Sequence, residues 1–188
     1  LHEKTVDWII DYCEGSIALD ELRIMIIRRQ HFLRASLDSS TFLHLIAPEV
    51  VSFYPDDTLY ISILRNPVQW GESYLGMLYQ FGKYIKQGIA PFDPSWAKRY
   101  GTFQAKELDP IRLFENIADR DYLDLVAHNL LRFWIDSEKR IFDSIPSGQL
   151  RVFRLEDLGE AVKIISTAMG VELNLYQPLQ KFNSATAD

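Results

Sequence analysis

The stretch that decides the fold is residues 58–75, Thr-Leu-Tyr-Ile-Ser-Ile-Leu-Arg-Asn-Pro-Val-Gln-Trp-Gly-Glu-Ser-Tyr-Leu. An apolar, β-branched run ends at Arg65, Pro67 follows, and Ser73 lies eight residues after the arginine. This order predicts a buried strand that delivers a guanidinium at its carboxyl end, followed by a turn and a helix. Ligands of open α/β sheets bind just beyond the carboxyl ends of the strands, and a guanidinium there can hold a phosphate bidentately. We therefore expect Arg65 and the hydroxyl of Ser73 to bind the same anion.

These residues also resemble a known family. Residues 63–68, Ile-Leu-Arg-Asn-Pro-Val, with Glu-Ser-Tyr at 72–74, resemble the 3′-phosphate-binding segment of sulfotransferases that use 3′-phosphoadenosine 5′-phosphosulfate (PAPS), in the version found in carbohydrate sulfotransferases. The resemblance implies that Arg65 and Ser73 bind the 3′-phosphate of the nucleotide. It also implies an α/β chain with the P-loop-NTPase-like sulfotransferase fold, in which a parallel sheet is flanked by many helices.

A second segment is similar to the same family. Residues 151–159, Arg-Val-Phe-Arg-Leu-Glu-Asp-Leu-Gly, followed by a helical stretch, resemble a sulfotransferase segment in which a strand ends before Glu-Asp-Leu. The family usually has a tyrosine where Leu155 stands here. The implied activity is transfer of a sulfuryl group from PAPS, as co-substrate, to a hydroxyl of a carbohydrate or small-molecule acceptor, with no metal.

The resemblance also points to a catalytic base. A histidine or a glutamate takes the proton of the acceptor in this family, and His31 stands where carbohydrate sulfotransferases often carry a base histidine. A partly buried histidine at a strand end is the alternative interpretation. Arg34 is either a substrate contact or a surface charge, and residues 181–184 resemble the terminal loop that closes over the nucleotide or are a polar tail.

One part of the family pattern has no counterpart here. PAPS enzymes begin with a strand and a basic phosphosulfate-binding loop, and no segment of this sequence matches it or a Gly-x-x-x-x-Gly-Lys-Ser/Thr loop. Because the chain opens with Leu1, we expect an N-terminally incomplete domain. The alternatives are a non-catalytic sulfotransferase-like binding module and another nucleotide-dependent transferase, for example a kinase-like enzyme.

Composition sets further bounds. The 188 residues, 47% of them hydrophobic, predict a single domain, 1–188, with a substantial core. A net charge of −6 argues against a general nucleic-acid binder. The sequence contains no run of about 18 apolar residues, so it predicts no membrane span. The lone Cys13 is typical of a reducing compartment, so we expect a cytoplasmic location. No metal-ligand spacing is present, and the sequence says nothing about oligomeric state.

Periodicity and turn residues predict the elements. Helices are expected over 3–14, 41–53 with a break at Pro48, 68–86, from Asp109-Pro110, over 121–144 and over 158–169, and strands over 58–64 and 150–155. Residues 22–28 fit a strand or a short buried helix, and the strand is favoured. The stretch 88–109 is the least regular. Most aromatic side chains on the expected helix 68–86 belong to the core, and one or two are expected to stack on a sugar or adenine ring.

Overall fold

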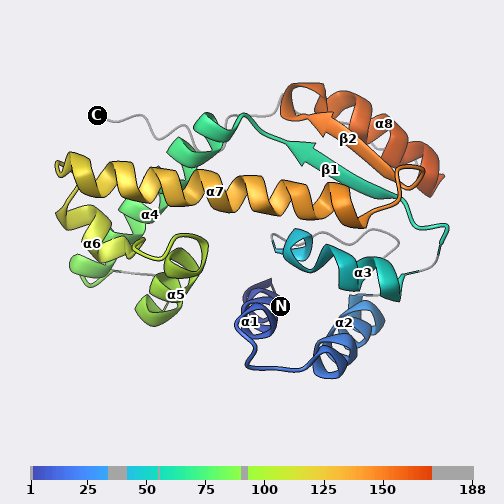
Figure 1. The fold of residues 1–188 in the computed structure, drawn as a ribbon, viewed down its shortest axis with the longest axis horizontal. Helices are drawn as coiled ribbons and strands as arrows, with labels where there is room; N and C mark the ends of the chain where they lie inside the picture. The colour runs from blue at the N-terminus through green and yellow to red at the C-terminus, as the bar shows by residue number, and fades with distance from the viewer. Residues whose placement is uncertain (1, 34–41, 55, 90–92, 171–188) are drawn as a thin grey trace. The chain divides into compact units, whose positions relative to one another are not determined.

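The structure is a computed structural model that describes residues 2–33, 42–54, 56–89 and 93–170. Arg34 and residues 181–184 lie outside these ranges. The helices of the described residues are α1 (His2–Cys13), α2 (Leu19–Leu33), α3 (Ala47–Phe53), α4 (Pro67–Lys86), α5 (Pro94–Gln104), α6 (Pro110–Glu115), α7 (Arg120–Ser144) and α8 (Leu158–Met169) (Figure 1). Short 3-10 helices occupy Leu43–Ile46 and Leu155–Asp157, and the strands are β1 (Tyr60–Leu64) and β2 (Leu150–Arg154).

The described chain is mostly helical with a small parallel sheet, which confirms the mixed α/β class. The expected helices corresponding to α1, α4, α7 and α8 are confirmed, as are both strands of the 58–75 and 150–155 segments. Pro48 does interrupt the segment 41–53, because a 3-10 helix ends at Ile46 and α3 begins next to the proline. Within the described residues the sheet has two strands, so the finer P-loop-like topology stays a prediction.

The predicted strand 22–28 is wrong, because these residues lie inside α2. Leu22, Ile26 and Arg29 are buried at helical spacing, whereas Ile24 and Ile27 are about half exposed. A strand would place residues 22, 24 and 26 on one face, so the observed burial follows the 3.6-residue period instead. The apolar run was ambiguous because a short buried helix and a buried strand share the same composition.

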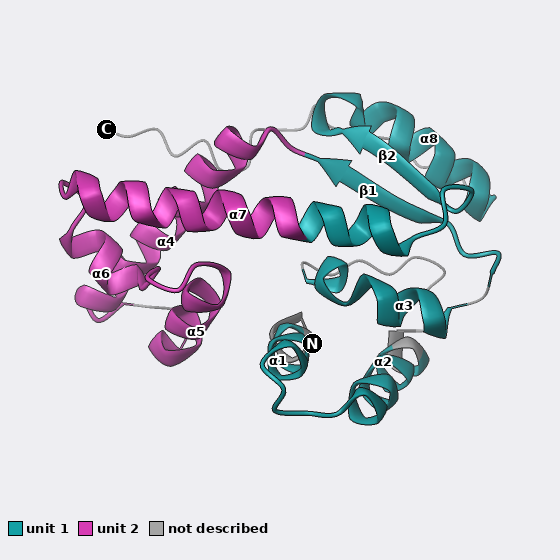
Figure 2. Cartoon of the chain, viewed as in Figure 1, with its two compact units in different colours: residues 1–64, 137–175 teal, residues 65–136, 176–188 magenta. Residues whose placement is uncertain are grey.

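Backbone contacts divide the chain into two compact units (Figure 2). Unit 1 contains residues 1–64 and 137–175, and unit 2 contains residues 65–136 and 176–188. The expectation of a single domain over 1–188 stays a prediction.

Unit 1 holds the parallel pair of strands. Tyr60 lies opposite Leu150 and Leu64 opposite Arg154, so both strands end at the same edge. Helix α8 follows β2 through a 3-10 turn and lies alongside it (Figure 1). Gly170 ends α8 with φ of 63°, a left-handed conformation that glycine adopts without a Cβ penalty.

Unit 2 is built around the contact of α4 with α6. Its core consists of Tyr74, Leu78, Ala105, Leu108, Leu113, Tyr122, Val126 and Leu130. Gly82 lies where α4 meets α6, and a Cβ atom there would stand 1.9 Å from the carbonyl oxygen of Pro110. The absence of a side chain at this position lets the two helix backbones approach closely.

Three helices of unit 2 begin with the same capping pattern. Asn66, Asp93 and Asp109 are the N-caps of α4, α5 and α6, and each is followed by a proline in the first turn. The side chain of each cap accepts a hydrogen bond from an otherwise unpaired amide, and proline has no amide to satisfy. The start of α6 was predicted from this pattern. Helix α5 lies in the stretch 88–109 described above as least regular, although Asp93-Pro94 carries the same signal.

Candidate anion-binding site

The β1–α4 junction places Arg65 at the carboxyl end of a strand, as expected from the sequence. β1 ends at Leu64, Arg65 is exposed, and α4 begins at Pro67. Within the described residues the Arg65 guanidinium forms no ion pair and no hydrogen bond, so it is available to an anion from solution.

The first turn of α4 contributes no free backbone amide. The side-chain oxygen of Asn66 accepts hydrogen bonds from the amides of Val68, at 2.9 Å, and of Gln69, at 3.4 Å. The amide of Trp70 donates to the carbonyl oxygen of Asn66 at 2.8 Å, and Pro67 has no amide hydrogen. Helix N-termini often bind phosphate through such amides, but here they are already occupied. An anion at this end of α4 must therefore be held by side chains.

Ser73 lies in the second turn of α4 and is half-buried. Helical Ser and Thr side chains often donate back to a carbonyl of their own helix. Thr102 and Thr167 do so at 2.9 Å, whereas Ser73 makes no side-chain hydrogen bond to a residue that the structure describes. Its hydroxyl is therefore free to donate to a ligand.

Arg65 and Ser73 belong to the same unit, and no hydrogen bond joins their side chains. Ser73 lies six residues after Pro67, about 9 Å along the helix axis at 1.5 Å per residue. An anion that binds both groups therefore requires the Arg65 side chain to extend along α4. Glu72, the nearest acidic residue in sequence, is exposed and points about 100° away from Ser73 around the helix.

His31, the expected base, belongs to a different compact unit from these two residues. His31 lies exposed in the last turn of α2, in unit 1, whereas Arg65 and Ser73 belong to unit 2. It therefore follows a helix and not the predicted strand. The assignment of His31 as the base stays a prediction that rests on the family resemblance alone.

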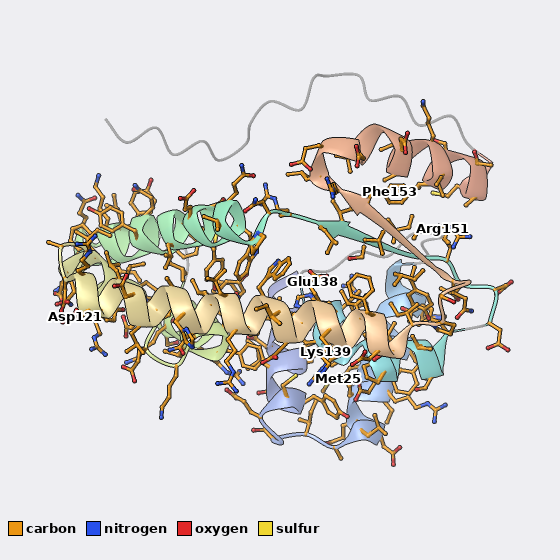
Figure 3. The ribbon with its side chains drawn as sticks, turned by 45° about the horizontal axis from the view of Figure 1, so that its top comes forward. Met25, Asp121, Glu138, Lys139, Arg151 and Phe153 are labelled. Atoms are coloured by element: carbon orange, nitrogen blue, oxygen red, sulfur yellow. The ribbon has the colours of Figure 1, made fainter. Side chains whose placement is uncertain are left out.

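One partly buried acid was not predicted from the sequence. Glu138 on α7 is half-buried, and its Oε2 atom has no hydrogen-bond partner among the described residues. Burial raises the pKa of its carboxyl group above the ordinary value. Figure 3 shows Glu138 and the exposed Lys139 on different sides of α7. The sequence gives little sign that the Glu138 carboxyl group is partly buried, because a glutamate on a charged helix is normally solvated.

Three further features of the described residues bear on a ligand cavity, a metal site and a membrane-spanning helix. A hollow in unit 1, lined mainly by Ile9, Leu22, Ile26, Ile46 and Arg29, has a volume of about 10 Å³. That is room for about one water molecule and excludes a nucleotide there. No group of three or more potential metal ligands is found among the described residues. Of the helices in the described ranges, none has the length and apolar character needed to cross a membrane.

Comparison with known proteins found no relative of this chain. No protein-family model matches the chain, no curated protein matches it, and no solved structure matches it. The resemblance to sulfotransferases therefore rests on the motif residues of the sequence and stays a prediction.

Proposed function

We propose that this chain is part of a PAPS-dependent sulfotransferase in which Arg65 and Ser73 bind the 3′-phosphate of the nucleotide. The observation that carries the proposal is the Arg65 guanidinium at the carboxyl end of β1, with the hydroxyl of Ser73 on the helix that follows, neither of which has a partner among the described residues. The spacing of the two residues is that of the family motif they resemble.

The chemistry of the two groups suits a phosphate monoester. A guanidinium forms two parallel charge-assisted hydrogen bonds with phosphate oxygens, and a serine hydroxyl adds a third donor. Because the α4 amides are satisfied by Asn66, selectivity at this site depends on the two side chains. A nucleotide without the 3′-phosphate should therefore bind much more weakly.

In the proposed reaction, the acceptor hydroxyl oxygen attacks the sulfur of PAPS and forms the new S–O bond. The bond from sulfur to the 5′-phosphate oxygen breaks, and 3′-phosphoadenosine 5′-phosphate leaves with the electron pair. A general base takes the proton of the acceptor hydroxyl. Arg65 and Ser73 do not touch the reacting atoms; they orient the nucleotide through its other end. His31 is the proposed base, and the acceptor is a carbohydrate or another small molecule.

Calorimetric titration of the full chain with 3′-phosphoadenosine 5′-phosphate and with adenosine 5′-phosphate tests the proposal. We expect the wild type to prefer the first compound. Loss of one charge-assisted contact removes about 1.5–3 kcal/mol, so Arg65→Ala should weaken binding about 10- to 150-fold. Ser73→Ala should weaken it about 2- to 12-fold, since a neutral hydrogen bond contributes about 0.5–1.5 kcal/mol.

Arg120→Ala is the matched control, because Arg120 is an exposed arginine of the same unit, at the start of α7. If Arg65→Ala binds the nucleotide as well as Arg120→Ala does, the assignment of the phosphate site is wrong. Specific nucleotide binding without sulfuryl transfer to any acceptor would favour the non-catalytic binding module.

A further inference from the structure

One side of α4 carries Ser73 between two apolar side chains. Trp70, Ser73 and Met77 are spaced by three and four residues, so they form one stripe along the helix. Trp70 and Ser73 are half-buried, and Met77 is 36% exposed. The buried side of α4 lies next to this stripe and carries Tyr74 and Leu78. The stripe is therefore the border of the helix at which a ligand can reach the Ser73 hydroxyl.

Trp70 is the outer ring of a stack of four aromatic side chains. Its indole stacks on Tyr74 with ring centroids 5.5 Å apart and planes at 12°. Tyr74 contacts Tyr100 at 5.9 Å, and Tyr100 stacks on Trp96 of α5 at 5.1 Å. Tyr74 is only 7% exposed, so the side of the indole that faces it is covered. Because Trp70 is half-buried, part of its side chain outside this contact remains exposed.

This stack holds the Trp70 ring in place before any ligand binds. The two rings of α4 and the two rings of α5 are each four residues apart on their helices, so each pair is fixed by helix geometry. A ring that is already ordered loses little conformational entropy when another ring stacks on it. Met77 adds a polarizable thioether, which makes favourable contacts with aromatic rings.

We propose that Trp70, flanked by Ser73 and Met77, is the surface on which the purine base of the nucleotide stacks. This inference rests on the proposed function, since it needs a nucleotide held by its phosphate at Ser73. Side chains three residues apart on a helix are about 5–6 Å apart at their Cβ atoms. A nucleotide anchored at the Ser73 hydroxyl therefore has its base within reach of the neighbouring indole. Trp70 then contributes selectivity for a nucleotide over a sugar phosphate.

The test compares 3′-phosphoadenosine 5′-phosphate with ribose 3,5-bisphosphate, which carries both phosphates and no base. Stacking of one base on an aromatic side chain is expected to favour the adenine compound about 5- to 150-fold in the wild type. Trp70→Ala should abolish this preference while leaving the affinity for ribose 3,5-bisphosphate unchanged. Trp70→Phe should keep part of it, because a phenyl ring still offers a face for stacking.

Trp96→Ala is the control, because Trp96 is the ring at the other end of the same stack and lies on α5. It should keep the preference for the adenine compound. If Trp70→Ala and Trp96→Ala weaken adenine binding equally, or if the wild type binds the two compounds equally well, the stacking role is wrong.

These outcomes separate the inference from the proposed function. Equal binding of both compounds, still lost in Arg65→Ala, overturns the role of Trp70 and leaves the phosphate site standing. Failure of the wild type to bind either compound overturns both.

Discussion

Replacement of Gly82 by alanine tests how closely α4 and α6 pack. A Cβ atom at position 82 would lie 1.9 Å from the carbonyl oxygen of Pro110, 2.7 Å from its carbonyl carbon and 2.9 Å from Cβ of Phe114. None of these atoms is the end of a flexible side chain. Helix α6 would therefore have to move as a whole to admit one methyl group.

The expected magnitude follows from two opposing effects. Overpacking of a well-packed core costs about 1–3 kcal/mol. Alanine in place of glycine inside a helix stabilises it by about 0.5–1 kcal/mol. Gly76→Ala on the same helix is the matched variant, because a Cβ atom there meets nothing within 4 Å and only the helix gain applies. Since both variants share that gain, Gly82→Ala should be less stable than Gly76→Ala by about 1–3 kcal/mol.

Thermal and urea unfolding, followed by far-UV circular dichroism, measure this difference. For a chain of this size each kcal/mol moves Tm by about 2–4 °C, so the two variants should differ by about 2–12 °C. Gly76→Ala should unfold slightly above the wild type. Equal Tm values, or a higher value for Gly82→Ala, would refute the close approach of α4 to Pro110.

Two further predictions concern a helix cap and a buried acid. Asn66→Ala removes the side-chain cap of two α4 amides and should lower the free energy of unfolding by about 1 kcal/mol in urea titrations; an unchanged midpoint would contradict the capping role. Glu138→Gln should stabilise the protein more at about pH 7 than at about pH 4. Because burial raises the pKa of Glu138 in the folded state, the wild type loses stability as pH rises from about 4.3 through that raised value, and glutamine does not titrate. A stability difference that is the same at both pH values would show that Glu138 is solvated.

Much of the candidate site could be predicted from sequence because its signals are local. The strand before Arg65, the proline after it and the helix that carries Ser73 all depend on residues within one segment. The occupied amides of α4 were also predictable in principle, since asparagine before proline is a typical helix start. The relation of His31 to this site depends on contacts distant in sequence, and local patterns do not report it.

Where prediction failed, tertiary packing decided the outcome. Residues 22–28 were predicted as a strand with a short buried helix as the alternative, and the burial of Leu22 and Ile26 on one helical face shows that the helix is right. The contacts of Gly82 with Pro110 and of Tyr74 with Tyr100 join residues more than 20 positions apart.

The sequence by itself determined where α4 and α6 begin and which groups reach the end of β1. Capping residues, prolines and hydrophobic periodicity act over a few residues, so they can be recognised in the sequence. Tertiary structure alone decided that the indole of Trp70 is supported by Tyr74 and that the carboxyl group of Glu138 is buried. Burial and ring stacking depend on which distant segments fold against one another, and no single stretch of sequence contains that information.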